Sequence, residues 1–223
     1  MTRDPSRVAL REDVYRLLAA CFYPPSPELF EERCLPALAG LLEDLAPEAA
    51  RHARDAADAG EQASLESLAV EHARLFIGPF HLVAPPYGSF YLDDAKTVMG
   101  ESTGKVTALY GSCGLHLADD FHEMPDHIAV ELEFLSFLAH RQRESIAAGD
   151  LVEANRFAGL QMSFLDRFLL PWLPPFTRSI LEGTESPFYQ AIARCTEAYV
   201  TADRDFLERL SGAPRDTANP HTS

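Results

Sequence analysis

Cysteine is scarce in this sequence. Only four cysteines occur among the 223 residues, and no two of them form a C-x-x-C pair. No cysteine belongs to a complete zinc-ligand pattern of cysteines and histidines. Cys21 and Cys195 lie in apolar stretches with helical periodicity, where a buried thiol behaves as a small hydrophobic side chain. We therefore expect Cys21, Cys34, Cys113 and Cys195 to be reduced, with neither a zinc site nor a disulfide framework.

Positive charge is also in short supply. The chain has 19 lysines and arginines against 34 aspartates and glutamates, which gives a formal net charge of -15. Such a surface repels nucleic acids and anionic membranes, which argues against both as partners. It suits a cationic partner, such as a peptide that carries arginines, although an acidic surface can also serve solubility alone.

Long apolar runs are missing. The first seven residues, M-T-R-D-P-S-R, are mostly polar, and the apolar segment of a signal peptide does not follow them. The densest apolar stretch, residues 164–176, contains Asp166, Arg167 and interrupting prolines, so it is too short and too broken to span a bilayer. We expect a cytoplasmic protein without stable membrane insertion.

The sequence has no convincing strand pattern, and helical periodicity dominates. Val14, Leu17, Leu18, Cys21 and Phe22 recur at i, i+3, i+4, i+7 and i+8, as on one face of an amphipathic helix. Similar stripes recur along most of the chain. The pattern therefore predicts an all-α helical bundle.

Local signals divide this bundle into segments. Serine followed by proline, at 26–27 and 186–187, is typical of a helix that begins with a serine N-cap and a proline at its first position. Pro36 is expected to kink or split the helix that follows residue 27. The alanine-rich segment 49–63 is either a solvated helix or a mobile connection.

The same signals suggest a single domain. Residues 1–211 form one all-helical unit, with a possible hinge at 116–124 between a larger N-terminal and a smaller C-terminal group of helices. The polar tail, residues 212–223, is expected to be disordered.

Residues 79–94 form a long loop that is rich in proline and aromatic side chains. Loops of this length inside compact domains tend to be functional. Aromatic anchors beside acidic groups are typical of a peptide-binding site, although the same rings could simply fill the core between helices. The side chains concerned are Phe80, Pro85, Pro86, Tyr87, Phe90 and Tyr91.

Asp126, His127 and Glu131 are the best candidates for catalytic chemistry. His127 and Glu131 share one helix face and could hold a metal, or Asp126 and His127 could act as acid and base. In the structural alternative, Asp126 stabilises the start of a helix and His127 donates to a nearby carbonyl. A nucleophile motif is missing, and residues 100–105 lack the spacing of a phosphate-binding loop. Further ligands could come from His116, Asp119, Asp120, His122 and Glu123.

Three groups of motifs follow one another between residues 71 and 199. They are 74–79 (R-L-F-I-G-P) with 85–93 (P-P-Y-G-S-F-Y-L-D) and 99–103 (M-G-E-S-T), then 124–127 (M-P-D-H) with 130–135 (V-E-L-E-F-L), then 169–172 (L-L-P-W) with 186–189 (S-P-F-Y). In this combination the chain resembles the TorD/DmsD family of redox-enzyme maturation chaperones.

The resemblance implies an all-α cytoplasmic protein without catalytic turnover, metal or cofactor. It implies a client as well: the precursor of a molybdopterin-containing oxidoreductase. The chaperone would bind the client's twin-arginine signal peptide and apoprotein, assist insertion of the molybdenum cofactor and delay export. The peptide-binding residues that the resemblance implies are Leu75, Phe76, Pro86, Tyr87, Asp126 and His127.

This site makes a geometric prediction. We expect the loop with Pro86 and Tyr87 to pack near the helix start at Asp126 and His127, some forty residues away. Asp126 could then pair with an arginine of the signal peptide, while Tyr87 and Phe76 receive its apolar part.

Some residues depart from the family pattern. Dimethyl-sulfoxide-reductase chaperones are rich in tryptophan where this chain has His72, Phe80, Tyr87 and Tyr91, and Met124 stands where glutamate is common. The client is therefore open among sulfoxide reductases, N-oxide reductases and related periplasmic dehydrogenases. Two alternatives are a NarJ-type nitrate reductase assembly chaperone and a metal-assisted enzyme. Domain-swapped dimerisation and weak nucleotide binding also stay open.

Overall fold

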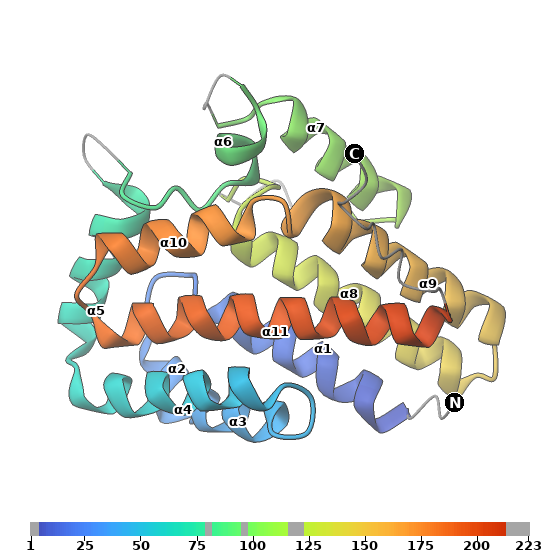
Figure 1. Ribbon diagram of the computed structural model, residues 1–223, viewed down its shortest axis with the longest axis horizontal. Coiled ribbons are helices and arrows are strands. Elements are labelled where there is room, and N and C mark those ends of the chain that lie inside the picture. Colours follow the sequence, from blue (N-terminus) through green and yellow to red (C-terminus); the bar gives the residue numbers. More distant parts are fainter. Residues whose placement is uncertain (1–4, 79–81, 95–97, 116–122, 213–223) are drawn as a thin grey trace, which may run out of the picture.

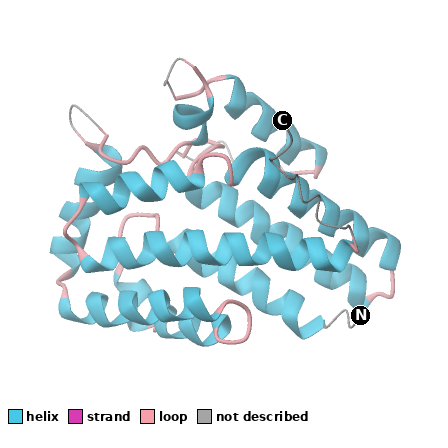
Figure 2. Cartoon of the chain, in the orientation of Figure 1, coloured by secondary structure: helices cyan, strands magenta, loops and turns pink. Residues whose placement is uncertain are grey.

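The computed structural model describes residues 5–78, 82–94, 98–115 and 123–212, and it is built from helices (Figures 1 and 2). These residues contain no β-strand, only one isolated bridge, which confirms the predicted all-α fold. The elements, with η for π-helical turns, are α1 (Pro5–Ala20), α2 (Pro27–Glu31), α3 (Cys34–Leu42), α4 (Pro47–Gln62), α5 (Leu65–His72), η1 (Ala73–Ile77), α6 (Gly88–Leu92), α7 (Glu101–Ser112), α8 (Ile128–Ala147), α9 (Leu151–Phe164), η2 (Leu165–Leu169), α10 (Leu173–Gly183) and α11 (Pro187–Ser211).

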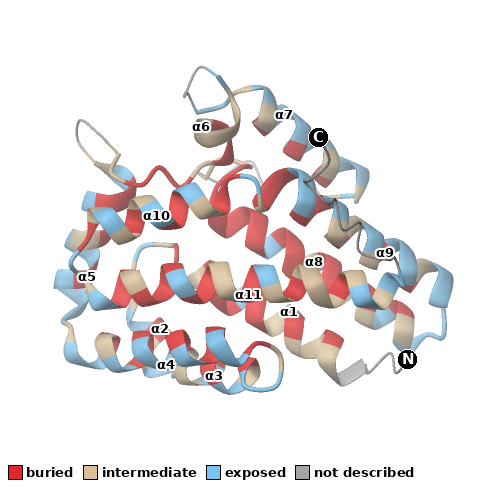
Figure 3. Ribbon diagram, in the orientation of Figure 1, coloured by how far each residue is buried: buried red, intermediate tan, exposed pale blue. Residues whose placement is uncertain are grey.

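The helices pack around one apolar core. Helix α1 packs along α8, α11 packs along α4, and α8 and α9 pack against each other. Figure 1 shows α11 crossing the middle of the view, with α10 on one side and α4 on the other. The apolar stripe predicted for α1 faces inward, since Val14 and Leu18 are fully buried (Figure 3). Elements from both sides of residues 116–124 are therefore interleaved.

A buried ion pair links the first helix to the last one. Arg11 of α1 donates through Nε to Asp203 Oδ1 of α11 at 2.5 Å, and through Nη2 to Oδ2 at 2.8 Å. Tyr15 donates its hydroxyl to the same carboxylate, and both charged side chains are almost completely buried. Gln142 and Gln161 accept the remaining guanidinium hydrogen bonds. Because each charge is compensated, removal of one partner leaves the other buried and unpaired.

Several local predictions are refined by the structure. The chain does divide near Pro36, but the break precedes it: α2 ends at Glu31 and Arg33 adopts a left-handed conformation. Pro36 lies in the first turn of α3, where its missing N–H costs no helical hydrogen bond. The alanine-rich segment is the helix α4, whose small side chains allow close packing against α11. The predicted long loop, residues 79–94, contains a short helix, α6.

The serine caps are a correction. Ser26 and Ser186 occupy the N-cap positions and proline follows each, but neither hydroxyl accepts a capping hydrogen bond. All four cysteines are free, with Cys21 and Cys195 buried. Within the described ranges, no helix combines the length and apolar character needed to cross a membrane. Most of the predicted hinge, residues 116–122, and nearly all of the predicted disordered tail, residues 213–223, lie outside the described residues.

Candidate functional site

Backbone hydrogen bonds hold the loop before α6 against two distant elements. The amide of Ala84 donates to the carbonyl of Leu75 in η1 at 2.9 Å. Farther along, Pro86 O accepts from the amide of Ile128 at 2.8 Å, and the Gly88 amide donates to Asp126 O at 2.8 Å. These two bonds flank an isolated antiparallel bridge between Tyr87 and His127. The predicted packing of this loop beside the start of α8 is therefore confirmed.

The side chain of Asp126 stabilises this loop through a hydrogen bond. Its Oδ2 atom accepts from the backbone amide of Ser89 at 2.8 Å, which satisfies an amide in the first turn of α6. The side chain is fully buried, and Oδ1 has no hydrogen-bond partner among the described residues. An arginine arriving from solvent therefore cannot reach Asp126 unless the loop moves. Asp126, the predicted partner of a client arginine, is therefore buried and not at the surface.

A second buried acid lies below the same loop. Glu131 is 1% exposed and accepts from Trp172 Nε1 through Oε2 at 3.2 Å. Burial raises the pKa of Glu131 well above its usual value, the Trp172 hydrogen bond opposes this, and the charge of Asp126 adds to it. A Cβ atom at Gly88 would lie 3.1 Å from Trp172 Nε1 and 3.3 Å from Glu131 Oε1. Glycine at this motif position therefore allows the loop to approach the pair closely.

His127 is an N-cap rather than a cation. Its Nδ1 atom accepts from the backbone amide of Ala129 at 3.2 Å, so it caps α8 instead of donating to a carbonyl as one alternative predicted. Burial, and secondarily His72, lowers the pKa of His127 to about 4. The ring is thus neutral near pH 7 with its proton on Nε2. The Glu123 carboxylate lies 3.9 Å from Nε2, too far for a hydrogen bond.

Two tyrosines border His127 at the surface. The Tyr23 ring is stacked on it with centroids 6.1 Å apart, and the Tyr87 ring meets it edge-on at 5.4 Å. Tyr23 donates its hydroxyl to Glu133 Oε1 at 3.1 Å. We call this group the aromatic–acidic surface; its members are Tyr23, Tyr87, Glu123 and Glu133, arranged around His127.

Negative charge at this surface lacks a cationic partner. Within the described part of the chain, neither Glu123 nor Glu133 forms an ion pair with lysine or arginine, and the same holds for the buried Asp126 and Glu131. Burial and then Glu133 and Glu123 raise the pKa of Tyr23. For Tyr87 the causes are burial, Glu123 and Asp126. The site is therefore an uncompensated acidic region with aromatic walls.

Leu75 and Phe76 form the inner wall behind the loop. Leu75 is fully buried, Phe76 is 3% exposed, and the Phe76 ring contacts those of Phe22, Phe176 and Tyr189. Hydrogen bonds therefore connect η1 to the loop at Leu75, and the loop to the start of α8, while the Phe76 ring lies among core aromatic rings. Pro86 is also buried, and among the six predicted residues only Tyr87 is partly exposed. Their role in peptide binding stays a prediction.

The residues that depart from the family pattern differ in their burial. His72 is 4% exposed and contacts the carbonyl of Phe22 through Nε2 at 3.2 Å. Tyr91 is half-buried and stacks on Trp172 with ring centroids 5.7 Å apart. Phe80 lies outside the described residues. Tyr23 was not among the predicted site residues, because nothing in its local sequence links it to α8.

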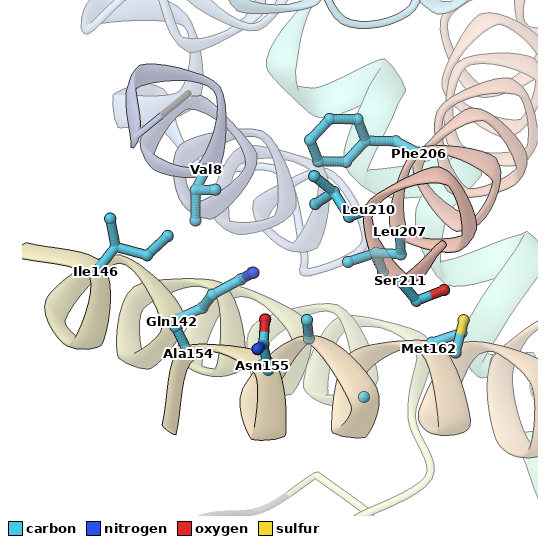
Figure 4. Close-up of a pocket in the computed structure, with 12 residues that line it drawn as sticks. Val8, Gln142, Ile146, Ala154, Asn155, Met162, Phe206, Leu207, Leu210 and Ser211 are labelled. Atoms are coloured by element: carbon cyan, nitrogen blue, oxygen red, sulfur yellow. The ribbon is translucent and has the colours of Figure 1, made fainter. Parts of the chain in front are cut away.

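The alternative enzymatic site finds no support in the described residues. They contain no group of three metal-ligating side chains, although His116, Asp119, Asp120 and His122 lie outside the described ranges. A cavity of about 320 Å³ lies between α1, α8, α9 and α11, and Figure 4 shows the side chains that line it. Its lining includes Gln142 but no ionisable side chain, so it offers neither an acid nor a base.

Comparison with known proteins identifies relatives. A family model described as "nitrate reductase delta subunit" matches residues 38–178. The TorD chaperone of Vibrio vulnificus strain YJ016 is 32% identical, over 66% of this chain and 66% of its own length. That of Psychrobacter sp. strain PRwf-1 is 31% identical, over 66% of this chain and 64% of its own length. The chain thus spans slightly less than two thirds of these relatives.

A solved structure has a similar fold. It is the crystal structure of a candidate redox enzyme maturation protein from Archaeoglobus fulgidus, with a TM-score of 0.51 and 25% sequence identity. The match covers 88% of this chain and 93% of the other. The similarity therefore extends over most of the chain.

Proposed function

The chain belongs to the nitrate reductase delta subunit family, together with the TorD chaperones, and we propose that it is a chaperone for the maturation of a redox enzyme. The client is the catalytic subunit of a molybdoenzyme. The chaperone binds the apo form and its twin-arginine signal peptide in the cytoplasm, assists insertion of the molybdenum cofactor and delays export. It performs no catalytic turnover of its own.

One observation carries this proposal: the loop before α6 is docked on the start of α8, next to uncompensated acidic groups. The docking places Tyr87 beside His127 and near Glu123. A signal peptide with adjacent arginines and an apolar stretch needs carboxylates and an aromatic wall together. Leu75, Phe76 and Pro86 are buried behind the aromatic wall, and Asp126 holds in place the loop that carries Tyr87.

The proposal is tested by titrating the protein with a twin-arginine signal peptide from a molybdoenzyme precursor of the same organism. A matched peptide with both arginines changed to glutamine should bind much more weakly. Tyr87→Ala should weaken binding of the arginine peptide roughly tenfold, because an aromatic anchor is lost. Its thermal melting should change little, since Tyr87 is only partly buried. Equal affinity for both peptides would contradict the proposal.

The two alternatives predict different outcomes. A NarJ-type chaperone would bind the apo form of a nitrate reductase catalytic subunit in preference to other apo molybdoenzymes, which a pull-down with several purified apoproteins would reveal. A metal-assisted enzyme using Asp126, His127 and Glu131 would retain a stoichiometric transition metal after purification. Metal analysis of the purified protein separates this enzyme from the chaperone.

A further inference from the structure

The proposed function leaves open which carboxylate contacts an arginine of the client. Asp126 is poorly placed, because it is fully buried and its Oδ2 atom already accepts from Ser89. Direct pairing would require the loop to leave α8, which breaks the hydrogen bonds of Pro86 O and of the Gly88 amide. A carboxylate that solvent already reaches is a better partner.

Glu133 is such a carboxylate. It lies on α8 at an exposed position, although partial burial of its carboxyl group raises its pKa. Its Oε1 atom accepts from the Tyr23 hydroxyl, and no hydrogen bond among the described residues uses Oε2. Tyr23 lies in the turn after α1, with its ring stacked on the neutral His127. A planar guanidinium can therefore meet both an aromatic ring and a carboxylate oxygen at one place, the arrangement it binds best.

Glu123 supplies a second carboxylate nearby. It lies 3.9 Å from His127 Nε2, and its charge raises the pKa of both Tyr23 and Tyr87. Glu133 therefore accepts from Tyr23 at one end of the chain of contacts Tyr23–His127–Tyr87, and Glu123 lies beside His127 in its middle. Neither glutamate has a lysine or arginine partner in the described residues.

Resting on the proposed function, we propose that one client arginine binds the Glu133 carboxylate and stacks on Tyr23, while its neighbour pairs with Glu123 beside Tyr87. Asp126 is a positioning residue that holds the loop. Arginine is preferred over lysine, because an ammonium group cannot make the planar stack and the bidentate hydrogen bonds.

The test compares four variants in the signal-peptide titration. Glu133→Gln should weaken binding roughly tenfold through loss of a charge-assisted hydrogen bond. The matched control Glu61→Gln removes an exposed charge from α4, which Figure 1 places on the opposite side of the molecule from α6, and should change affinity less than about twofold. Asp126→Asn keeps an oxygen that can accept from Ser89, so it should change affinity by less than about threefold. Glu133→Arg should abolish binding.

Charge exchange makes the test specific. A peptide with one arginine changed to glutamate should bind Glu133→Arg better than it binds the wild type, which a purely structural role of Glu133 does not predict. The salt dependence of the association rate should also be shallower for Glu133→Gln.

Two results would overturn the inference in distinguishable ways. In the first result, Glu133→Gln binds the peptide as tightly as the wild type, and Asp126→Asn binds it tenfold more weakly. This result assigns the arginine contact to Asp126, and the proposed function still holds. In the second result, the wild-type protein binds the arginine peptide and the glutamine peptide with equal affinity. This result contradicts both the proposed function and this inference. Thermal melts of each variant confirm that the folded protein is being titrated.

Discussion

Acid should destabilise this protein through His127, and His127→Asn should remove that effect. The ordinary pKa of histidine is 6.5, while burial and His72 lower that of His127 to about 4 in the folded chain. Between these two pH values, His127 is protonated in the unfolded chain and neutral in the folded chain. The stability is therefore complete above pH 6.5 and is lost as the pH falls toward 4. The linkage relation gives a loss of about 1.4 kcal/mol at pH 5.5 and about 2.5 kcal/mol at pH 4.5.

Asparagine is the matched substitution because its side-chain oxygen can accept the Ala129 amide as an N-cap. Loss of the ring contacts with Tyr23 and Tyr87 should lower stability by the same amount at every pH. Urea denaturation at pH 7.5, 5.5 and 4.5 gives the free energy of unfolding of both proteins, and subtraction removes the contribution of the carboxylates. Parallel curves for the two proteins would refute the buried, neutral state of His127.

The other predictions concern buried charges. Glu131→Gln keeps an acceptor for Trp172 but removes an acid whose raised pKa disfavours the folded state above its ordinary pKa of 4.5. It should therefore stabilise the protein by about 1–3 kcal/mol at pH 7.5 and by almost nothing near pH 4.5; an equal gain at both pH values contradicts this cause. Asp203→Asn leaves Arg11 as an uncompensated buried charge and should cost about 3–5 kcal/mol in urea denaturation. The exposed Asp58→Asn control should stay within about 0.5 kcal/mol.

Helix positions were predictable wherever an apolar stripe is carried by large side chains. The stripe from Val14 to Phe22 shows the buried face of α1 directly. Segment 49–63 could not be assigned from its sequence because alanine gives only a weak contrast between buried and exposed faces. The structure resolves it through a partner far away in sequence, since α4 packs on α11. Periodicity reveals a face, but not what covers it.

The short helix α6 could not be predicted from the sequence for a different reason. Five residues are too few to form a stable helix alone, so α6 depends on nonlocal support. One support is the Asp126 carboxylate, 37 residues away, and another is the close approach of Gly88 to Trp172. Resemblance identified these motif residues, but their spacing did not reveal that Asp126 would be buried. Because Asp126 is buried, it stabilises the loop instead of lying at the surface, where a client arginine was expected to bind it.

This burial explains why the motif residues and the exposed residues of the site are different sets. A loop that presents Tyr87 outside a helical bundle has no periodic face of its own, so buried polar groups must hold it in place. Asp126 and His127 provide these contacts, and a change at either one disturbs the loop before it disturbs a client. Among the described residues, Tyr23 and Glu133 form no hydrogen bond with the loop, so they can be changed without breaking its attachment to α8. We therefore expect substitutions at Tyr23 and Glu133 to change client preference while the attachment of the loop is preserved.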